Sequence, residues 1–106
     1  MFSASVTEVN KNLKRSRINS LEFIEWKKWV KTDSTAFIKP NFTFPYYKEG
    51  ITTTPELLKN LLEIIKDGAN NTILGESNGG NHSFTADEAF EGHNMYEICK
   101  EVFGMD

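Results

Sequence analysis

A strand–helix–strand pattern in the middle of the sequence constrains the fold of this chain more than any other feature. Residues 35–39 (TAFIK) and 71–74 (NTIL) are short runs that suit buried β-strands. Pro40 ends the first run because proline cannot donate to a central ladder, and Gly75 ends the second. The continuous apolar centre of the first run, AFI, is typical of a strand covered on both faces of its sheet.

The helix between these strands has clear start and stop signals. Thr54 is a good N-cap, Pro55 suits the first helical position, and Glu56 complements the helix dipole. Gly68 supplies a left-handed stop. The apolar stripe consists of Leu57, Leu58, Leu61, Leu62 and Ile65. A strand, a helix of this length and a second strand form a right-handed βαβ unit, so we expect the two strands to be parallel.

Two capping boxes predict further helices after the second strand. Thr85 with Glu88 opens a helix over 86–91 that Gly92 closes. A second box opens the last helix, which contributes four packing candidates. Its cap pair is Asn94 with Glu97, its packing residues are Tyr96, Ile98, Val102 and Phe103, and its stop is Gly104.

The first 34 residues carry weaker signals. Residues 2–6 allow a weak edge strand, and Val9–Leu13 allows a helix. Asn19 with Glu22 forms a capping box that predicts an amphipathic helix over 20–30. Its two tryptophans, Trp26 and Trp29, are expected to be core or half-buried packing residues.

The expected fold is therefore α/β: a small, mostly parallel sheet of two strands, with residues 2–6 as the candidate third, flanked by four helices. We divide the chain into a helical segment over 1–34 and an α/β part over 35–106, which resembles a fragment of a larger three-layer sandwich. So few strands leave an exposed sheet edge. We expect the chain to self-associate through that edge or to be marginally stable.

Composition excludes several classes of function. The net charge is −3, made of +4 in residues 1–53 and −7 in residues 54–106, and the isoelectric point near 5.4 argues against a nucleic-acid partner. No apolar run approaches the roughly 20 residues of a membrane span, and the N-terminus lacks the order of a signal peptide. Cys99, the one cysteine, excludes an internal disulfide and is expected to pack. We expect a soluble cytoplasmic protein.

The loops that follow the two strands form the candidate binding region, because ligands of open α/β sheets bind outside the carboxyl ends of the strands. A lysine there offers a point charge to a phosphate or carboxylate, threonines at a helix N-terminus lie where anions bind, and glycines allow a ligand close to the backbone. The candidate ligand-binding residues are Lys39, Asn41, Thr53, Thr54, Glu76, Ser77, Gly79 and Gly80. Five of them have a structural alternative: loop stabilisation for Asn41, exposure to solvent for Lys39, capping for Thr54, and tight turns for Gly79 and Gly80.

The loop over 41–53 is long for a small domain, which favours either a function or packing of the loop on itself. Its aromatic residues are expected to pin it to the body, the alternatives being a pocket wall or a contact with a partner chain. These residues are Phe42, Phe44, Tyr46 and Tyr47.

Other chemistries lack support in the sequence. The run GESNGG matches neither a Walker loop nor a dinucleotide fingerprint. Glu76 and His82 are too few to form a metal site, and His93, just after a helix stop, is expected to be an ordinary residue. Ser77 and Ser83 have no partnered base, so no nucleophilic triad is predicted.

Four segments, FIKPNFTFP, GITTTPELL, ILGESNGG and SFTADEAFEGHNMYEICK, are similar in order and content to the domain of unknown function 362 family over about residues 35–104. The resemblance implies an α/β domain of which this chain is the N-terminal part, apparently truncated. Some relatives carry a cysteine-rich ferredoxin-like module for iron–sulfur clusters, but no cysteines here match it, so no cofactor is expected. The resemblance names no reaction, and whether the chain is an enzyme stays open.

We therefore expect a small anionic ligand at the two loops. The alternative is a truncated, non-catalytic remnant or a protein-interaction module.

Overall fold

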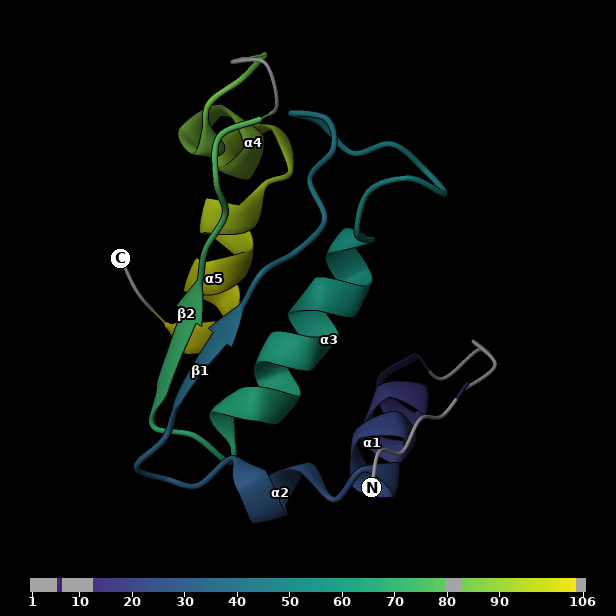
Figure 1. Cartoon of the computed structure of the whole chain (residues 1–106), viewed down its shortest axis with the longest axis vertical. Helices are drawn as coiled ribbons and strands as arrows, with labels where there is room; N and C mark the ends of the chain where they lie inside the picture. The colour runs from purple at the N-terminus through teal and green to yellow at the C-terminus, as the bar shows by residue number, and fades with distance from the viewer. Residues whose placement is uncertain (1–5, 7–12, 80–82, 105–106) are drawn as a thin grey trace.

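The chain folds into a two-stranded sheet and five helices, within the residues that the structure describes (Figure 1). The structure is a computed structural model that describes residues 6, 13–79 and 83–104. The elements are α1 (Leu13–Phe23), α2 (Trp26–Trp29), β1 (Thr35–Ile38), α3 (Pro55–Lys66), β2 (Asn71–Leu74), α4 (Ala86–Gly92) and α5 (Met95–Phe103). The predicted α/β class is confirmed. The edge strand predicted over 2–6 and the helix predicted over 9–13 fall almost wholly outside the described residues.

The two strands are parallel, as predicted, and Phe37 is in register with Ile73. However, exposure alternates along both strands, which shows that only one face of the sheet is covered. Phe37 is 62% exposed and Ile73 49% exposed on the open face. The prediction that both faces are covered is therefore wrong for the described residues, and the apolar run in β1 leaves one large ring in solvent.

The covered face packs on two hydrophobic clusters. The larger joins the apolar sides of α3 and α5, with Leu58, Leu62, Ile98 and Val102 among its buried residues. The smaller surrounds Trp26 and attaches α1 and α2 to the C-terminal half of α3. In Figure 1, α3 and α5 run beside the sheet, and α1 and α2 lie toward the C-terminal end of α3.

The single helix predicted over 20–30 is wrong: the chain breaks between α1 and α2. Asn19 and Ser20 lie inside α1, where the Ser20 hydroxyl donates to the carbonyl of Ser16 at 3.0 Å. Glu25 adopts a left-handed conformation (φ 54°), which redirects the chain before Trp26. Because Trp26 is buried against α3, this tertiary contact outweighs the local capping signal.

The helix limits of α3 are as predicted, but two of the expected signals act differently. Thr54 is the N-cap residue, yet its side chain makes no capping hydrogen bond. Gly68 does not have a positive φ; a Cβ there would lie 2.6 Å from the Trp26 ring, so the glycine makes room for the indole. Gly104 does have the expected left-handed conformation (φ 66°) after α5.

The capping box predicted for α4 is present, whereas the one predicted for α5 is not. The Thr85 hydroxyl accepts a hydrogen bond from the Glu88 amide at 3.1 Å, as predicted. Asn94 precedes α5 but is left-handed (φ 60°), and its side chain makes no capping hydrogen bond, so that prediction is wrong. The tight turn between the two helices, with Asn94 donating to Glu91 O, sets this conformation.

Candidate functional site

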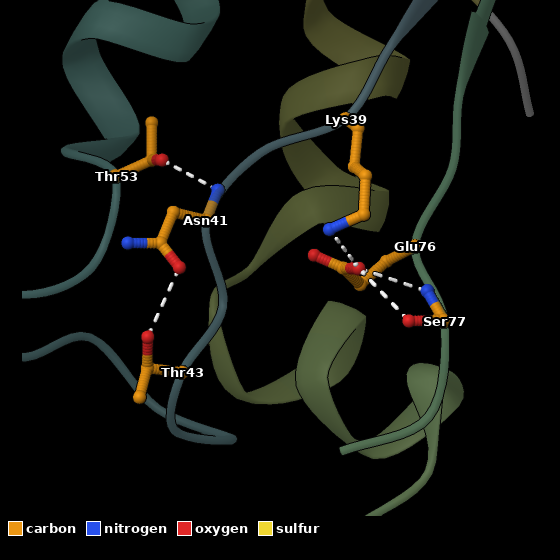
Figure 2. Close-up of polar contacts among 6 residues, drawn as sticks. All are labelled: Lys39, Asn41, Thr43, Thr53, Glu76 and Ser77. Carbon is orange, nitrogen blue, oxygen red and sulfur yellow. Dashed lines mark hydrogen bonds and ion pairs between the residues drawn. The ribbon is translucent and has the colours of Figure 1, made fainter. Parts of the chain in front are cut away.

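The loops that leave β1 and β2 emerge at the same end of the parallel sheet and contact each other. The link is an ion pair between Lys39 Nζ and Glu76 Oε1 at 2.8 Å (Figure 2). Gly75 also donates its amide to the Ile38 carbonyl at 3.0 Å, which extends the pairing of the strands by one residue. The structure thus brings together one candidate residue from each loop, Lys39 and Glu76.

Glu76 is the buried member of the pair. Its side chain is 5% exposed, against 59% for Lys39. Burial acts to raise the pKa of Glu76, but the hydrogen bond from Lys39 and backbone hydrogen bonds involving Ser77 and Phe42 outweigh burial, so the pKa lies below its usual value of 4.5. Glu76 therefore stays charged at neutral pH, with its charge shared among a cation and the backbone.

Asn41 and Thr53 form a second, separate group of contacts in Figure 2. The Asn41 amide donates to Thr53 Oγ1 at 2.7 Å, and the Thr53 amide donates to the Asn41 carbonyl at 3.0 Å. The Asn41 side chain donates to the Ile51 carbonyl and accepts from Thr43 Oγ1, each at 3.0–3.1 Å. These contacts close the base of the long loop and agree with the structural alternative for Asn41.

The loop after β2 is also internally bonded. The Ser77 amide donates to Glu76 Oε1 at 2.8 Å, while the exposed Ser77 hydroxyl is 3.5 Å from the same oxygen. Gly79 donates its amide to the Phe84 carbonyl, and a Cβ at Gly79 would lie 2.5 Å from the Phe84 ring. Packing thus explains this glycine, and Gly80 lies outside the described residues.

Comparison with known proteins assigns the chain to a family. A family model described as Domain of unknown function (DUF362) matches residues 37–106. The chain belongs to the DUF362 family. No match was found among curated proteins or among solved structures. The resemblance predicted from the four segments is confirmed, and every candidate residue falls within the DUF362 match.

His93, in the DUF362 region, is the residue that sequence reasoning missed. It is 2% exposed, its ring stacks on Phe42 at 4.0 Å between centroids, and its Nε2 lies 2.7 Å from the Phe44 carbonyl oxygen. Since a carbonyl only accepts, Nε2 carries the proton and donates. His93 thus clamps the long loop onto the turn between α4 and α5, and its position after Gly92 gave no signal of this role.

The aromatic residues of the long loop over 41–53 include both buried and exposed side chains. Phe42 is 6% exposed and belongs to the larger core cluster, as the packing interpretation predicted. Tyr46 and Tyr47 are 52% and 43% exposed and do not pin the loop to the body. A Cβ at Gly92 would lie 1.6 Å from the Pro45 carbonyl oxygen, so the loop backbone approaches α4 at this glycine.

Neither a metal-binding group of three or more ligand side chains nor a membrane-spanning helix occurs within the described residues. No group of three or more His, Cys, Asp or Glu side chains is placed to hold a metal ion within residues 13–79 and 83–104, and His82 lies outside them. Among these residues, no helix has the length and apolar character needed to cross a bilayer. Cys99 is half-buried, and burial raises the pKa of its thiol above the ordinary value.

Proposed function

We propose that this DUF362 domain binds a small anionic ligand at the loops after β1 and β2, with Lys39 as its cationic contact. The carrying observation is the asymmetry of the Lys39–Glu76 pair, in which the carboxylate is buried and the ammonium group is largely exposed. The ion pair with the buried Glu76 carboxylate orients the Lys39 side chain, while the Lys39 ammonium group stays largely open to solvent.

The charge distribution around Glu76 supports this role for Lys39. The backbone hydrogen bonds of Glu76 with Ser77 and Phe42 compensate part of its negative charge. Lys39 is therefore not fully neutralised by its partner and can attract a phosphate or carboxylate. The exposed Ser77 hydroxyl, only weakly held at 3.5 Å, is the nearby group able to turn toward such a ligand.

The other candidate residues support the site indirectly. Asn41 and Thr53 fix the base of the loop through their mutual hydrogen bonds, so their proposed contribution is to hold Lys39 in place. Thr54 and the first turn of α3 add a helix dipole on the same loop, although Glu56 places a negative charge there.

The test is a titration of the ¹⁵N-labelled chain with a panel of small phosphorylated and carboxylated compounds, followed by amide chemical shifts. We expect shifts confined to residues 39–43 and 75–79. Lys39→Gln should weaken binding by about tenfold or more, which corresponds to about 1.4 kcal/mol, and Lys39→Arg should weaken it less. Lys31→Gln, at an exposed lysine before β1, is the matched control. Absence of shifts in both loops, or equal loss with Lys31→Gln, would contradict the proposal.

A second candidate function is a protein-interaction module that self-associates through the β1 edge of the sheet and the open face beside it. The observation that favours it is the exposure of Phe37 and Ile73 at neighbouring positions of that face. Sedimentation at increasing concentrations should then show dimers that Phe37→Ser weakens and Tyr46→Ser, at another exposed aromatic, does not. A monomer at all concentrations would exclude this function. For either function, the proposed compartment is the cytoplasm.

A further inference from the structure

A chain of contacts joins the buried His93 to the ion pair of the proposed anion site. The His93 ring stacks on the Phe42 ring, with 4.0 Å between the centroids and 11° between the planes. Phe90 of α4 contacts the same Phe42 ring edge-on, at 6.0 Å between centroids. Because Phe42 is also buried in the larger core cluster, its ring has little freedom to move while His93 and Phe90 stay in place.

The backbone of Phe42 carries this contact to Glu76. A carboxylate only accepts hydrogen bonds, so the backbone hydrogen bond between the two residues runs from the Phe42 N–H to Glu76. The same carboxylate pairs with Lys39 Nζ at 2.8 Å (Figure 2). Glu76 thus holds both ends of the segment over 39–42, by a side chain at one end and by a backbone amide at the other. A shift of Phe42 therefore changes the surroundings of the carboxylate that orients Lys39.

The two ring nitrogens of His93 are used unequally. Nε2 donates to the Phe44 carbonyl at 2.7 Å, whereas Nδ1 is buried and has no hydrogen-bond partner among the described residues. A buried polar atom without a partner is unfavourable, and a phenylalanine at this position would avoid that cost while keeping the stack. The contact that a phenylalanine could not make is the bond from Nε2, which fixes the loop two residues after Phe42.

We propose that His93 is a positioning residue of the anion site: it fixes residues 42–44 and thereby holds the Glu76 carboxylate where it orients Lys39. This role rests on the proposed function, because Lys39 is the ligand contact assigned there. His93 is 2% exposed, so it acts through Phe42 and Glu76 and has no contact of its own with a ligand in solvent. The coupling between His93 and Glu76 consists of contacts within the chain, so it can be measured without a ligand.

A purely structural clamp would behave differently. Its loss would lower the free energy of unfolding but leave the surroundings of Glu76 and the anion affinity of the folded chain unchanged. Ile64→Ala is the matched control, because Ile64 is 6% exposed and belongs to the smaller cluster, which contains neither Phe42 nor His93. Ile64 lies in the last turn of α3, whereas the long loop leads into the first turn.

The first measurement uses the full chain without a ligand. The ¹³C signal of the Glu76 carboxyl group is recorded at pH 7 and followed to lower pH. His93→Ala should move this signal and raise the pKa of Glu76 toward the ordinary value of 4.5, because a hydrogen bond to the charged form is weakened. His93→Phe keeps the stack and should produce a smaller change in the same direction, and it replaces His93→Ala if that variant does not fold. Ile64→Ala should leave the signal in place.

The second measurement is the affinity for inorganic phosphate. We expect His93→Ala to weaken binding about fivefold or more, His93→Phe to weaken it less, and Ile64→Ala to change it by less than about twofold. Failure of the unmodified chain to bind phosphate counts against the proposed function and leaves the Glu76 signal to decide on His93. A Glu76 signal that both His93 variants leave unchanged, or that Ile64→Ala moves as far, would overturn the positioning role. A folded His93→Ala variant that binds phosphate as tightly as the unmodified chain would overturn it too.

Discussion

At the scale of single residues, Glu76 and His93 are two buried polar side chains that help to fix the loops of the candidate site. Both are nearly inaccessible to solvent, and each is bonded to a loop that is distant in sequence: Glu76 to Lys39, and His93 to Phe44. A buried polar group left without its partner is costly, so these contacts are expected to contribute more to stability than the exposed ion pairs of the helices.

The first prediction concerns acid stability. Because folding lowers the pKa of Glu76, the unfolded chain binds the proton more readily, so this residue stabilises the fold above its unfolded pKa near 4.5. That contribution is lost as the pH falls through the lower folded pKa. In urea unfolding between pH 6 and pH 3, Glu76→Gln should lose stability less steeply than the unmodified chain. Glu49→Gln, at the exposed loop tip, should keep the original slope; equal slopes for all three proteins would contradict the role of Glu76.

The second prediction concerns His93. His93→Ala removes a buried ring, its stack on Phe42 and its hydrogen bond to Phe44, and should lower the free energy of unfolding by about 2–4 kcal/mol. His93→Phe keeps the stack and should cost less. Urea denaturation gives both values, and a loss below about 1 kcal/mol for His93→Ala would mean that the ring does not clamp the loop.

At the scale of secondary structure, the threonines before α3 and α4 look alike in sequence but differ in their contacts. Thr85 accepts a hydrogen bond from Glu88, whereas the Thr54 side chain makes no capping bond. Pro55 occupies the first helical position of α3 and fixes its backbone in advance, so α3 begins without help from a side chain.

The third prediction follows from this difference. Thr85→Ala should cost about 1 kcal/mol, the usual value for a lost N-cap, and Thr54→Ala clearly less. Thermal unfolding of the two variants side by side is sufficient, since each removes the same atoms from an exposed residue. Equal losses would mean that the Thr85 bond does not contribute in solution.

At the scale of the whole molecule, the two hydrophobic clusters divide the fold into two parts, and the part with the sheet is expected to persist without the part formed by α1 and α2. The larger cluster joins the sheet with α3 and α5, whereas the smaller attaches α1 and α2 through Trp26. Lys14 on α1 adds an ion pair to Glu63 at 3.1 Å, but such a half-exposed pair contributes little. The attachment of α1 and α2 thus depends chiefly on the apolar packing of Trp26, Ile18 and Leu21.

The fourth prediction is that Trp26→Ala releases α1 and α2 while the sheet persists. Trypsin should then cleave at Lys27 and Lys28 at least tenfold faster, and the amides of β1 and β2 should stay protected from exchange. Trp29→Ala is the matched control, because Trp29 is 74% exposed. Equal cleavage rates in both variants, or loss of strand protection with Trp26→Ala, would contradict this division.

The sequence predicted the elements whose signals are local and missed those set by distant contacts. The strands, α3 and the start of α4 depend on Pro55, Thr85 and short apolar runs, all readable within a few residues. The break at Glu25 depends on the burial of Trp26 against Gly68, more than 40 residues away. For the site, the meeting of Lys39 and Glu76 follows from parallel strands, but the burial of His93 depends on a loop 49 residues away.

The long loop has a consequence for how this domain can be altered. Its base is closed by Asn41 and Thr53, and its first half is held by His93 and by the backbone packing at Gly92. The tip is different: Gly50 is left-handed (φ 77°), nothing lies within 4 Å of where its side chain would be, and the hydrogen bonds around it, from the amides of Ile51 and Thr52 to the Lys48 carbonyl, stay within the turn. A peptide tag or a fluorescent reporter spliced in at Gly50 should therefore leave the fold intact, which makes this tip a practical insertion point for following the molecule.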